Sequence, residues 1–311
     1  MKPITITDVT VATVVPFTES GGIDRDGYRN VLEYCTPPGV AAVFVNGHAG
    51  EGAALTDRER LEILELTRRH VGAENPVMCG VISFSTDDAI RQARDFVSAG
   101  CDIPVLFPPP SFAAGGALTP DAPVAFVRAV AEAVDAPLSI FQYPVQSGCG
   151  YTTDTLVAMS QIPNVMAIKE GSDTIFAYEE TWRKVKAARP DVAVLPSNFD
   201  WFLPQLAIGA DGILSGLASL TPHLLVELWR AAEAVDLRAM RAVSDRLYPI
   251  VRGIYGRAPR MDMHTRIKEG LQHLGIIKCA KPRGPLLPVS DEIRQSVRSA
   301  VDGAGLRAYA R

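Results

Sequence analysis

The stretch NVMAIKEGSD, residues 164–173, shows the unit from which most of the chain is built. Its apolar run predicts a buried β-strand that ends at Lys169, and Gly171-Ser172-Asp173 is typical of a turn that opens into a helix. A buried ammonium group is costly unless it is paired or loses its proton. A partly neutral amine attacks carbonyl groups, so Lys169 is a candidate for Schiff-base formation, with an ordinary ion-paired lysine as the alternative.

The same strand–turn–helix pattern recurs along the first two-thirds of the chain. Helices alternate with the strands, among them a short one expected near 153–160 and the seventh near 201–208, and the clearest helix start is the capping box Thr56-Asp57-Arg58-Glu59. This alternation predicts a parallel sheet closed into a (β/α)8 TIM barrel. A doubly wound sheet would normally have a glycine-rich phosphate loop after its first strand, which PFTESGG at 16–22 matches poorly. Strands are expected at 9–16, 40–45, 77–82, 102–107, 137–141, 165–169, 192–195 and 212–215.

From Thr221-Pro222 onward the pattern becomes wholly helical. We expect a barrel over residues 1–220 and a C-terminal helical extension over 221–311. No linker rich in glycine, serine or charge separates the two, so the extension is expected to pack on the barrel as part of one structural unit. Its helices are predicted at 224–235, 237–255, 265–274 and 291–304.

Composition limits the classes of partner. The net charge of −4 gives no general attraction to nucleic acid or to an anionic membrane, and no apolar run approaches the length of a membrane span. We expect no signal peptide, because MKPITITDVT has no basic segment followed by an apolar core. The five cysteines are scattered and odd in number, which favours reduced thiols. We therefore expect a cytoplasmic enzyme, with no metal because no His, Asp or Cys spacing indicates one.

Two loops are the strongest candidates for the active site, because they follow predicted C-terminal strand ends, where TIM barrels form active sites. One contains Lys169. The other, Gly47-His48-Ala49-Gly50-Glu51-Gly52, has three glycines, so its amides could approach a carboxylate, with a tight turn as the alternative. His48 is either an acid–base group or an exposed loop residue. Glu51 and Glu170 are candidates either for catalysis or for fixing a loop by hydrogen bonds to backbone amides. Lys281 and Arg283 predict a small, solvated basic spot.

At these residues the chain resembles the dihydrodipicolinate synthase / N-acetylneuraminate lyase family of class I Schiff-base aldolases. The resemblance covers almost the whole length. It implies that Lys169 is the Schiff-base lysine, that the eighth-strand residues Leu214 and Ser215 bind substrate together with Gly47, His48 and Ala49, and that the protein is a homotetramer built as a dimer of dimers. The motifs are VVPF at 14–17, GHAGEGAAL at 47–55 with its continuation to Arg60, AIKEGSD at 167–173, GADGILS at 209–215, RIK…LGI at 266–276 and RGPL at 283–286.

The departures from the family pattern fall on the proton relay and on the substrate contacts. Phe141 stands where the family places its relay tyrosine, and His48 replaces the threonine that usually bonds that tyrosine. Ser111 replaces a tyrosine that a neighbouring subunit supplies, and Gln146 aligns with the arginine of dihydrodipicolinate synthases. Phenylalanine cannot transfer a proton, which is typically worth about 10²–10⁴-fold in rate. Dihydrodipicolinate synthesis itself is therefore not expected.

Two side chains are candidates to replace the missing hydroxyl. Tyr143 lies two residues after Phe141, and the period of a strand would point both side chains to the same face. His48 already occupies the place of the family threonine. We favour His48 slightly, because the proline after Tyr143 anchors the motif and argues against a shift of register.

The sequence thus predicts a Schiff-base lyase that acts on pyruvate or another 2-oxo acid. A dehydratase or deaminase of a sugar acid or cyclic imino acid is the second interpretation, and a barrel that binds a 2-oxo acid without turnover is the third. No cofactor is expected, because an iminium formed on Lys169 serves as the electron sink. The expected partners are a small-molecule substrate and further copies of the chain.

Overall fold

The computed structural model describes residues 6–172, 174–197 and 202–307. Asp173, the last residue of the stretch quoted first, lies outside the described residues, and so does Trp201, where the seventh helix was expected to begin. Within the described part of the chain, the predicted alternation of strands and helices is confirmed.

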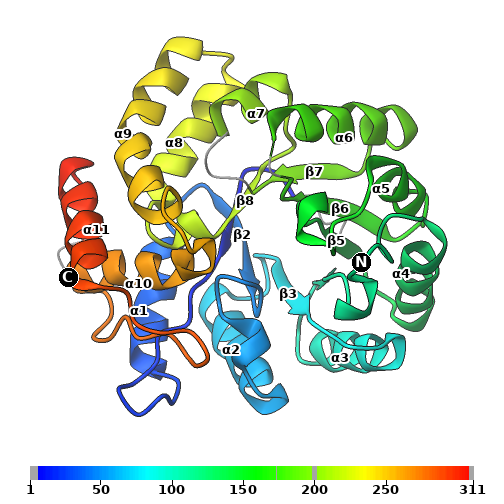
Figure 1. The fold of residues 1–311 in the computed structure, drawn as a ribbon, viewed down its shortest axis with the longest axis horizontal. Coiled ribbons are helices and arrows are strands. Elements are labelled where there is room, and N and C mark those ends of the chain that lie inside the picture. The colour runs from blue at the N-terminus through cyan, green and yellow to red at the C-terminus, as the bar shows by residue number, and fades with distance from the viewer. Residues whose placement is uncertain (1–5, 173, 198–201, 308–311) are drawn as a thin grey trace.

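Eight parallel strands form the centre of the molecule (Figure 1). Backbone pairing joins them in the order β7-β6-β5-β4-β3-β2-β1-β8. Asp211 brings the two outer strands together, because its carboxylate accepts from the Val194 amide at 2.8 Å and its own amide donates to the Val194 carbonyl at 3.3 Å. The predicted TIM barrel is confirmed. The strands are β1 Val9–Ala12, β2 Val40–Val45, β3 Val77–Val81, β4 Ile103–Leu106, β5 Leu138–Phe141, β6 Val165–Glu170, β7 Ala193–Pro196 and β8 Ile213–Ser215.

Helices surround the strands in chain order, and further helices follow on one side of the barrel (Figure 1). The apolar core is continuous between Val11 in β1, Leu225 in α8 and Leu271 in α10. The boundary at residue 220 stays a prediction. The helices are α1 Arg25–Cys35, α2 Asp57–Val71, α3 Thr86–Ser98, α4 Asp121–Ala133, α5 Thr153–Ser160, α6 Ile175–Ala188, α7 Phe202–Ile208, α8 Pro222–Glu233, α9 Leu237–Tyr255, α10 Met263–His273 and α11 Asp291–Gly303.

The first strand ends four residues earlier than predicted. The strand ends at Ala12, although the amide of Thr13 still donates to the carbonyl of Phe44 in β2 at 3.0 Å. The amide of the next residue, Val14, donates instead to the hydroxyl of Ser219 at 3.2 Å. Ser219 in turn donates to the carbonyl of Ala12 at 2.9 Å. A side chain 205 positions away thus takes the place of a strand partner.

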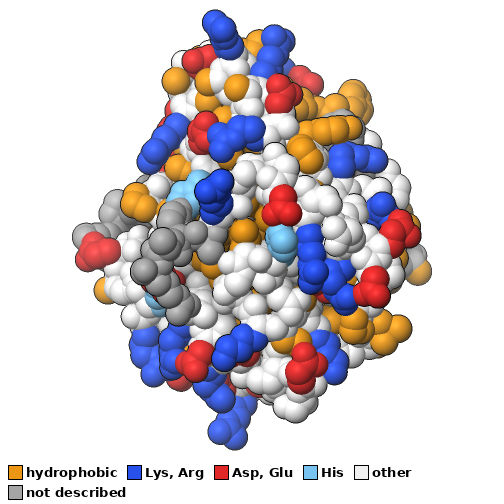
Figure 2. All heavy atoms as spheres, turned by 90° about the vertical axis from the view of Figure 1, so that its left-hand side faces the viewer, with side chains coloured by type: hydrophobic (Ala, Val, Ile, Leu, Met, Phe, Trp, Pro, Cys, Tyr) orange, Lys and Arg blue, Asp and Glu red, His pale blue; other side chains and the backbone are white. Residues whose placement is uncertain are grey.

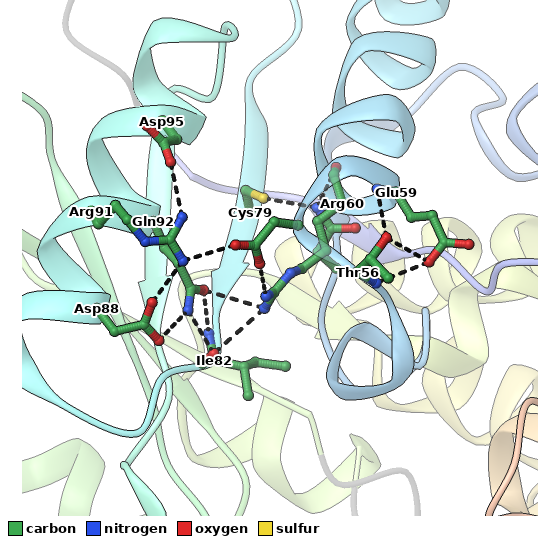
Figure 3. A network of polar contacts seen from close by, with 11 residues as sticks. Thr56, Glu59, Arg60, Cys79, Ile82, Asp88, Arg91, Gln92 and Asp95 are labelled. Atoms are coloured by element: carbon green, nitrogen blue, oxygen red, sulfur yellow. Dashed lines mark hydrogen bonds and ion pairs between the residues drawn. The ribbon is translucent and has the colours of Figure 1, made fainter.

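A polar network links α2 to α3 beside the end of β3 (Figure 3). Gln92 donates to the carbonyl of Ile82 at 2.9 Å and accepts from the amide of Ile82 at 3.2 Å. Arg60 donates to the Gln92 carbonyl oxygen at 3.3 Å. At the start of α2, Thr56 and Glu59 form the predicted capping box. These bonds satisfy backbone groups that would otherwise be left without partners where the strand ends.

The surface carries mixed charge. Acidic and basic side chains are interspersed over the face of the molecule on the left-hand side of Figure 1 (Figure 2). All five cysteines are free and four are buried, as expected for reduced thiols. In the described part of the chain, none of the helices combines the length and the apolar character that a membrane crossing requires.

Candidate active site

A cavity of about 350 Å³ lies at the C-terminal ends of the strands. Its walls come from strand ends and the loops that follow them, and from the segment that leads into α10. The lining residues are Ala12, Phe44, His48, Ala49, Phe141, Gln142, Tyr143, Pro144, Ser147, Lys169, Gly171, Ser197, Gly216, Arg260, Met261, Met263 and His264.

Lys169 projects into this cavity from β6. It is 8% exposed, and its Nζ lies 4.1 Å from the centre of the Phe141 ring. It makes no salt bridge or hydrogen bond to a side chain of any described residue. Burial lowers the pKa of Lys169 to about 7, against the opposing effect of the neighbouring Glu170 carboxylate. A large fraction of this amine is therefore neutral and nucleophilic near pH 7.

The two candidates for the proton relay contact each other. Tyr143 Oη and His48 Nε2 are 2.8 Å apart, within hydrogen-bond distance. Burial lowers the pKa of His48 to about 4, helped by the nearby Lys169 ammonium, and burial raises the pKa of Tyr143. Both side chains are consequently neutral at pH 7, and either can donate, depending on the imidazole tautomer.

Phe141 forms the aromatic floor beneath Lys169. Its ring stacks on Phe107 with 4.1 Å between centroids, and the Tyr143 ring centroid lies 4.8 Å from that of Phe141. Phe141 therefore occupies a packed position next to the lysine without offering a hydroxyl. The polar contact at this end of β5 is made instead by Tyr143.

The β2 loop carries free donors. The backbone N–H groups of His48 and Ala49 donate to no acceptor among the described residues, whereas the amides of Glu51 and Gly52 bond back to the carbonyls of His48 and Gly47 at 3.0 Å. A side chain at position 47 would lie 2.6 Å from the Phe44 ring, so only glycine fits there. The loop can thus present two amides to an anion.

Glu51 fixes this loop. Its carboxylate pairs with Lys268, which is fully buried, and accepts from the amide of Arg283 at 2.8 Å. Glu51 has φ of 52°, in the left-handed region. Glu170 likewise accepts from a backbone amide, that of Ser172 at 3.3 Å. Both carboxylates therefore hold loops in place.

The prediction of a solvated basic spot at 281–283 is wrong for Arg283. Its guanidinium donates to both carboxylate oxygens of Glu59 at 2.8 Å and lies 4.5 Å from the Phe17 ring centre. Lys281 is exposed and donates to the carbonyl of Glu19 at 3.1 Å. The folded chain brings an acidic partner to Arg283 from 224 positions away, which the local sequence does not reveal.

Several predicted substrate contacts lie outside the cavity lining. Ser111 and Gln146 are exposed on short 3-10 turns, Pro110–Phe112 and Val145–Ser147. Leu214 and Ser215 are fully buried in β8, where the Ser215 hydroxyl accepts from the amide of Leu217 at 3.1 Å. Gly47 is buried in the loop beside the cavity. The substrate-binding roles of these residues stay predictions.

The Dihydrodipicolinate synthetase family matches residues 5–304 of the chain. The chain belongs to this family. Among curated relatives, the 4-hydroxy-tetrahydrodipicolinate synthase of Methanothrix thermoacetophila is 30% identical over 294 residues, 93% of this chain and 94% of the relative. Membership in the dihydrodipicolinate synthetase family makes the protein an enzyme of the lyase class.

Solved structures share the fold. The dihydrodipicolinate synthase of Thermotoga maritima has a TM-score of 0.89 at 24% identity, covering 97% of this chain and 99% of that one. The chloride-inhibited dihydrodipicolinate synthase of Acinetobacter baumannii, complexed with pyruvate, has a TM-score of 0.86 at 24% identity, with coverage of 97% and 99%.

In this family member, the sequence interpretation missed the contribution of the C-terminal helices to the site. His264, one residue before the predicted helix 265–274, is 5% exposed and lines the cavity, with its ring centroid 6.0 Å from that of His48. Burial, together with His48 and the lysines Lys268 and Lys169, lowers the pKa of His264 well below its usual range. The sequence feature that could have identified this residue is a histidine at the start of an otherwise amphipathic helix. Among the described residues, no group of three or more His, Cys, Asp or Glu side chains is placed to hold a metal ion.

Proposed function

We propose that the protein is a Schiff-base lyase that acts on pyruvate or another 2-oxo acid through Lys169. The observation that carries this proposal is the buried amine at the cavity floor, unpaired among the described side chains and with its pKa lowered to about 7. Family membership and the pyruvate complex of the Acinetobacter relative support it.

The carboxylate of the substrate would lie on the N–H groups of His48 and Ala49. Both donors are free of described acceptors and belong to the loop that Glu51 fixes. Charge-assisted bonds to a carboxylate are stronger than neutral ones. Held there, the 2-oxo acid presents its ketone carbon to the cavity in which Lys169 lies.

The chemistry then follows from an amine and a proton relay. Neutral Lys169 attacks C2 of the ketone, water leaves, and an iminium forms. In a retro-aldol cleavage, a base removes the proton of the C4 hydroxyl, the C3–C4 bond breaks, an aldehyde leaves, and the electron pair of that bond forms an enamine that is later protonated at C3. Condensation is the reverse sequence.

Tyr143 and His48 would move these protons as one unit. Their 2.8 Å separation supports a combined role, whereas the sequence left them as alternatives. Both are neutral at pH 7, so the hydroxyl can pass a proton toward the imidazole and recover it. The relay that the family places on a tyrosine at position 141 is thus proposed to lie on position 143.

We propose that the natural reaction is not dihydrodipicolinate synthesis. Phe141 has no hydroxyl, and Gln146, which replaces the arginine that such synthases keep, is exposed outside the cavity lining. Ser111 is also exposed. The substrate partner of the 2-oxo acid therefore differs from the one that those side chains serve.

Covalent trapping tests the proposed function. Borohydride added in the presence of pyruvate should reduce the iminium, leaving a stable mass increase that peptide mapping places at Lys169. Lys169→Met should give no adduct, while Lys184→Met, a surface lysine on α6 paired with Glu180, should label like the wild type. Wild-type protein that traps neither pyruvate nor other 2-oxo acids at neutral pH would overturn the proposal.

A further inference from the structure

His264 is a buried polar group in the cavity that the proposed reaction does not use. It stands in the first turn of α10, is 5% exposed and lines the cavity. Its ring makes no hydrogen bond to any residue that the structure describes. Buried polar groups are normally paired, so a ring without a partner that faces a cavity points to a ligand.

The ring of His264 closes one corner of the cavity. It meets the His48 ring edge-on, with 6.0 Å between centroids and 63° between planes. A Cβ added to Gly216 would lie 3.2 Å from the Cβ of Ala49, 3.8 Å from Cδ1 of Ile267 and 3.9 Å from Cδ2 of His264. Ala49 and His264 therefore lie next to Gly216, all three line the cavity, and a side chain at residue 216 would reduce the room between them.

This corner offers donors and no acidic group. The amides of His48 and Ala49 donate to no described acceptor, and a neutral imidazole always carries one N–H. No Asp or Glu is among the described residues that line the cavity. The matching ligand is a small anion that accepts several hydrogen bonds, and a carboxylate is the anion that a 2-oxo acid brings.

We propose that His264 is a substrate-binding residue whose imidazole N–H donates a hydrogen bond to the carboxylate of the 2-oxo acid, beside the amides of His48 and Ala49. This inference rests on the proposed function, because it assigns a further contact to the same substrate. The lowered pKa of His264 keeps its ring neutral near pH 7, so the contact is a hydrogen bond and not an ion pair. His264 thereby distinguishes 2-oxo acids from ketones that lack a carboxylate.

The test compares two ketones that share the reacting group. Borohydride trapping is measured by intact mass as a function of pyruvate concentration, and at a fixed concentration of acetone, which has no carboxylate. In His264→Leu the half-saturating pyruvate concentration should rise about tenfold or more, the scale of a lost bond to a charged group. The acetone trapping rate should stay within about twofold. His264→Asn, which keeps a donor, should fall between the leucine variant and the wild type.

Two further variants guard against a general disturbance of the fold. Gly216→Ala fills the same corner without changing His264 and should also raise the half-saturating pyruvate concentration while sparing acetone. His273→Asn changes an exposed histidine on the same helix and should behave like the wild type. Melting temperatures identify a variant that does not fold.

The outcomes separate the two proposals. Unchanged pyruvate saturation in His264→Leu and in Gly216→Ala overturns the inference while wild-type trapping still supports the lyase. An equal loss with pyruvate and acetone also overturns it, because His264 then acts on the amine and not on the carboxylate. Wild-type protein that traps no 2-oxo acid overturns the proposed function itself.

Discussion

The hydroxyl of Tyr143 lies 2.8 Å from Nε2 of His48, so two side chains that are 95 positions apart form one polar pair at the mouth of the barrel. Tyr143 comes from the segment after β5 and His48 from the loop after β2. Each meets the ring of Phe141, which in turn lies under Lys169. The aromatic ring at position 141 thus places the relay beside the amine without taking part in proton transfer.

Removing either member of this pair should slow proton transfer much more than covalent binding. In Tyr143→Phe and in His48→Gln, we expect the exchange of the pyruvate C3 protons with D₂O to fall by about 10²–10⁴-fold. The double variant should be no slower than the worse single variant, because the two groups act as a unit. Proton NMR measures the exchange. Tyr248→Phe, a surface tyrosine on α9, serves as the control, and wild-type exchange in both single variants would contradict the relay.

The trapping rate should rise with pH through about 7. Lys169 is the nucleophile only when neutral, and burial places its pKa at about 7. Because the pKa of His48 is about 4, its titration should not change the trapping rate above pH 5. The Glu170 carboxylate opposes the shift, so Glu170→Gln should move the midpoint to lower pH. Initial trapping rates between pH 5 and 9 measure both midpoints, and an upward move in Glu170→Gln would contradict this account.

Lys169→Met should stabilise the fold below neutral pH. The folded pKa is about 7 against 10.5 for the free side chain, so between these values the unfolded chain binds more protons and stability rises with pH. The penalty is full below about pH 7, and each pKa unit is worth about 1.4 kcal/mol. Denaturant unfolding should therefore show a gain of a few kcal/mol at pH 6 that declines toward pH 10. A gain independent of pH would show that packing, and not charge, causes it.

Breaking the Glu51–Lys268 pair should destabilise the protein and weaken substrate binding together. Lys268→Met leaves a buried carboxylate without its cation, a loss of about 3–5 kcal/mol in comparable pairs. The exposed pair Arg246–Glu227 is the matched control, and Arg246→Met should change stability by less than about 1 kcal/mol. Urea unfolding gives both values. Since Glu51 holds the loop that carries the His48 and Ala49 amides, Lys268→Met should also raise the half-saturating pyruvate concentration.

The protein is expected to assemble as a homotetramer, a dimer of dimers. The prediction comes from the family resemblance, and exposed aromatic side chains such as Phe84 and Phe176 are compatible with burial between subunits. Sedimentation velocity should give four times the chain mass of 33.5 kDa. A monomer at micromolar concentration would contradict it.

Local patterns determined most of the fold. The periodicity and caps of α5 and α9 set their bounds at the predicted residues 153–160 and 237–255, and Thr56 with Glu59 marked the start of α2. The helical period, the strand period and the capping bonds all act within a few residues, so the sequence displays them directly. The strand run that ends at Lys169 placed the candidate nucleophile at the mouth for the same reason.

Only the tertiary structure decided which groups accompany that lysine. The pair of Tyr143 with His48, the approach of His264 to the same corner, and the burial of Lys268 against Glu51 all join segments far apart in the chain. Closure of the barrel and packing of α10 beside the cavity create these contacts, and burial then shifts the pKa values of Lys169 and both histidines. Neither distance nor desolvation is a property of a short stretch of sequence. The sequence alone therefore identified the amine, and the fold determined its polar surroundings.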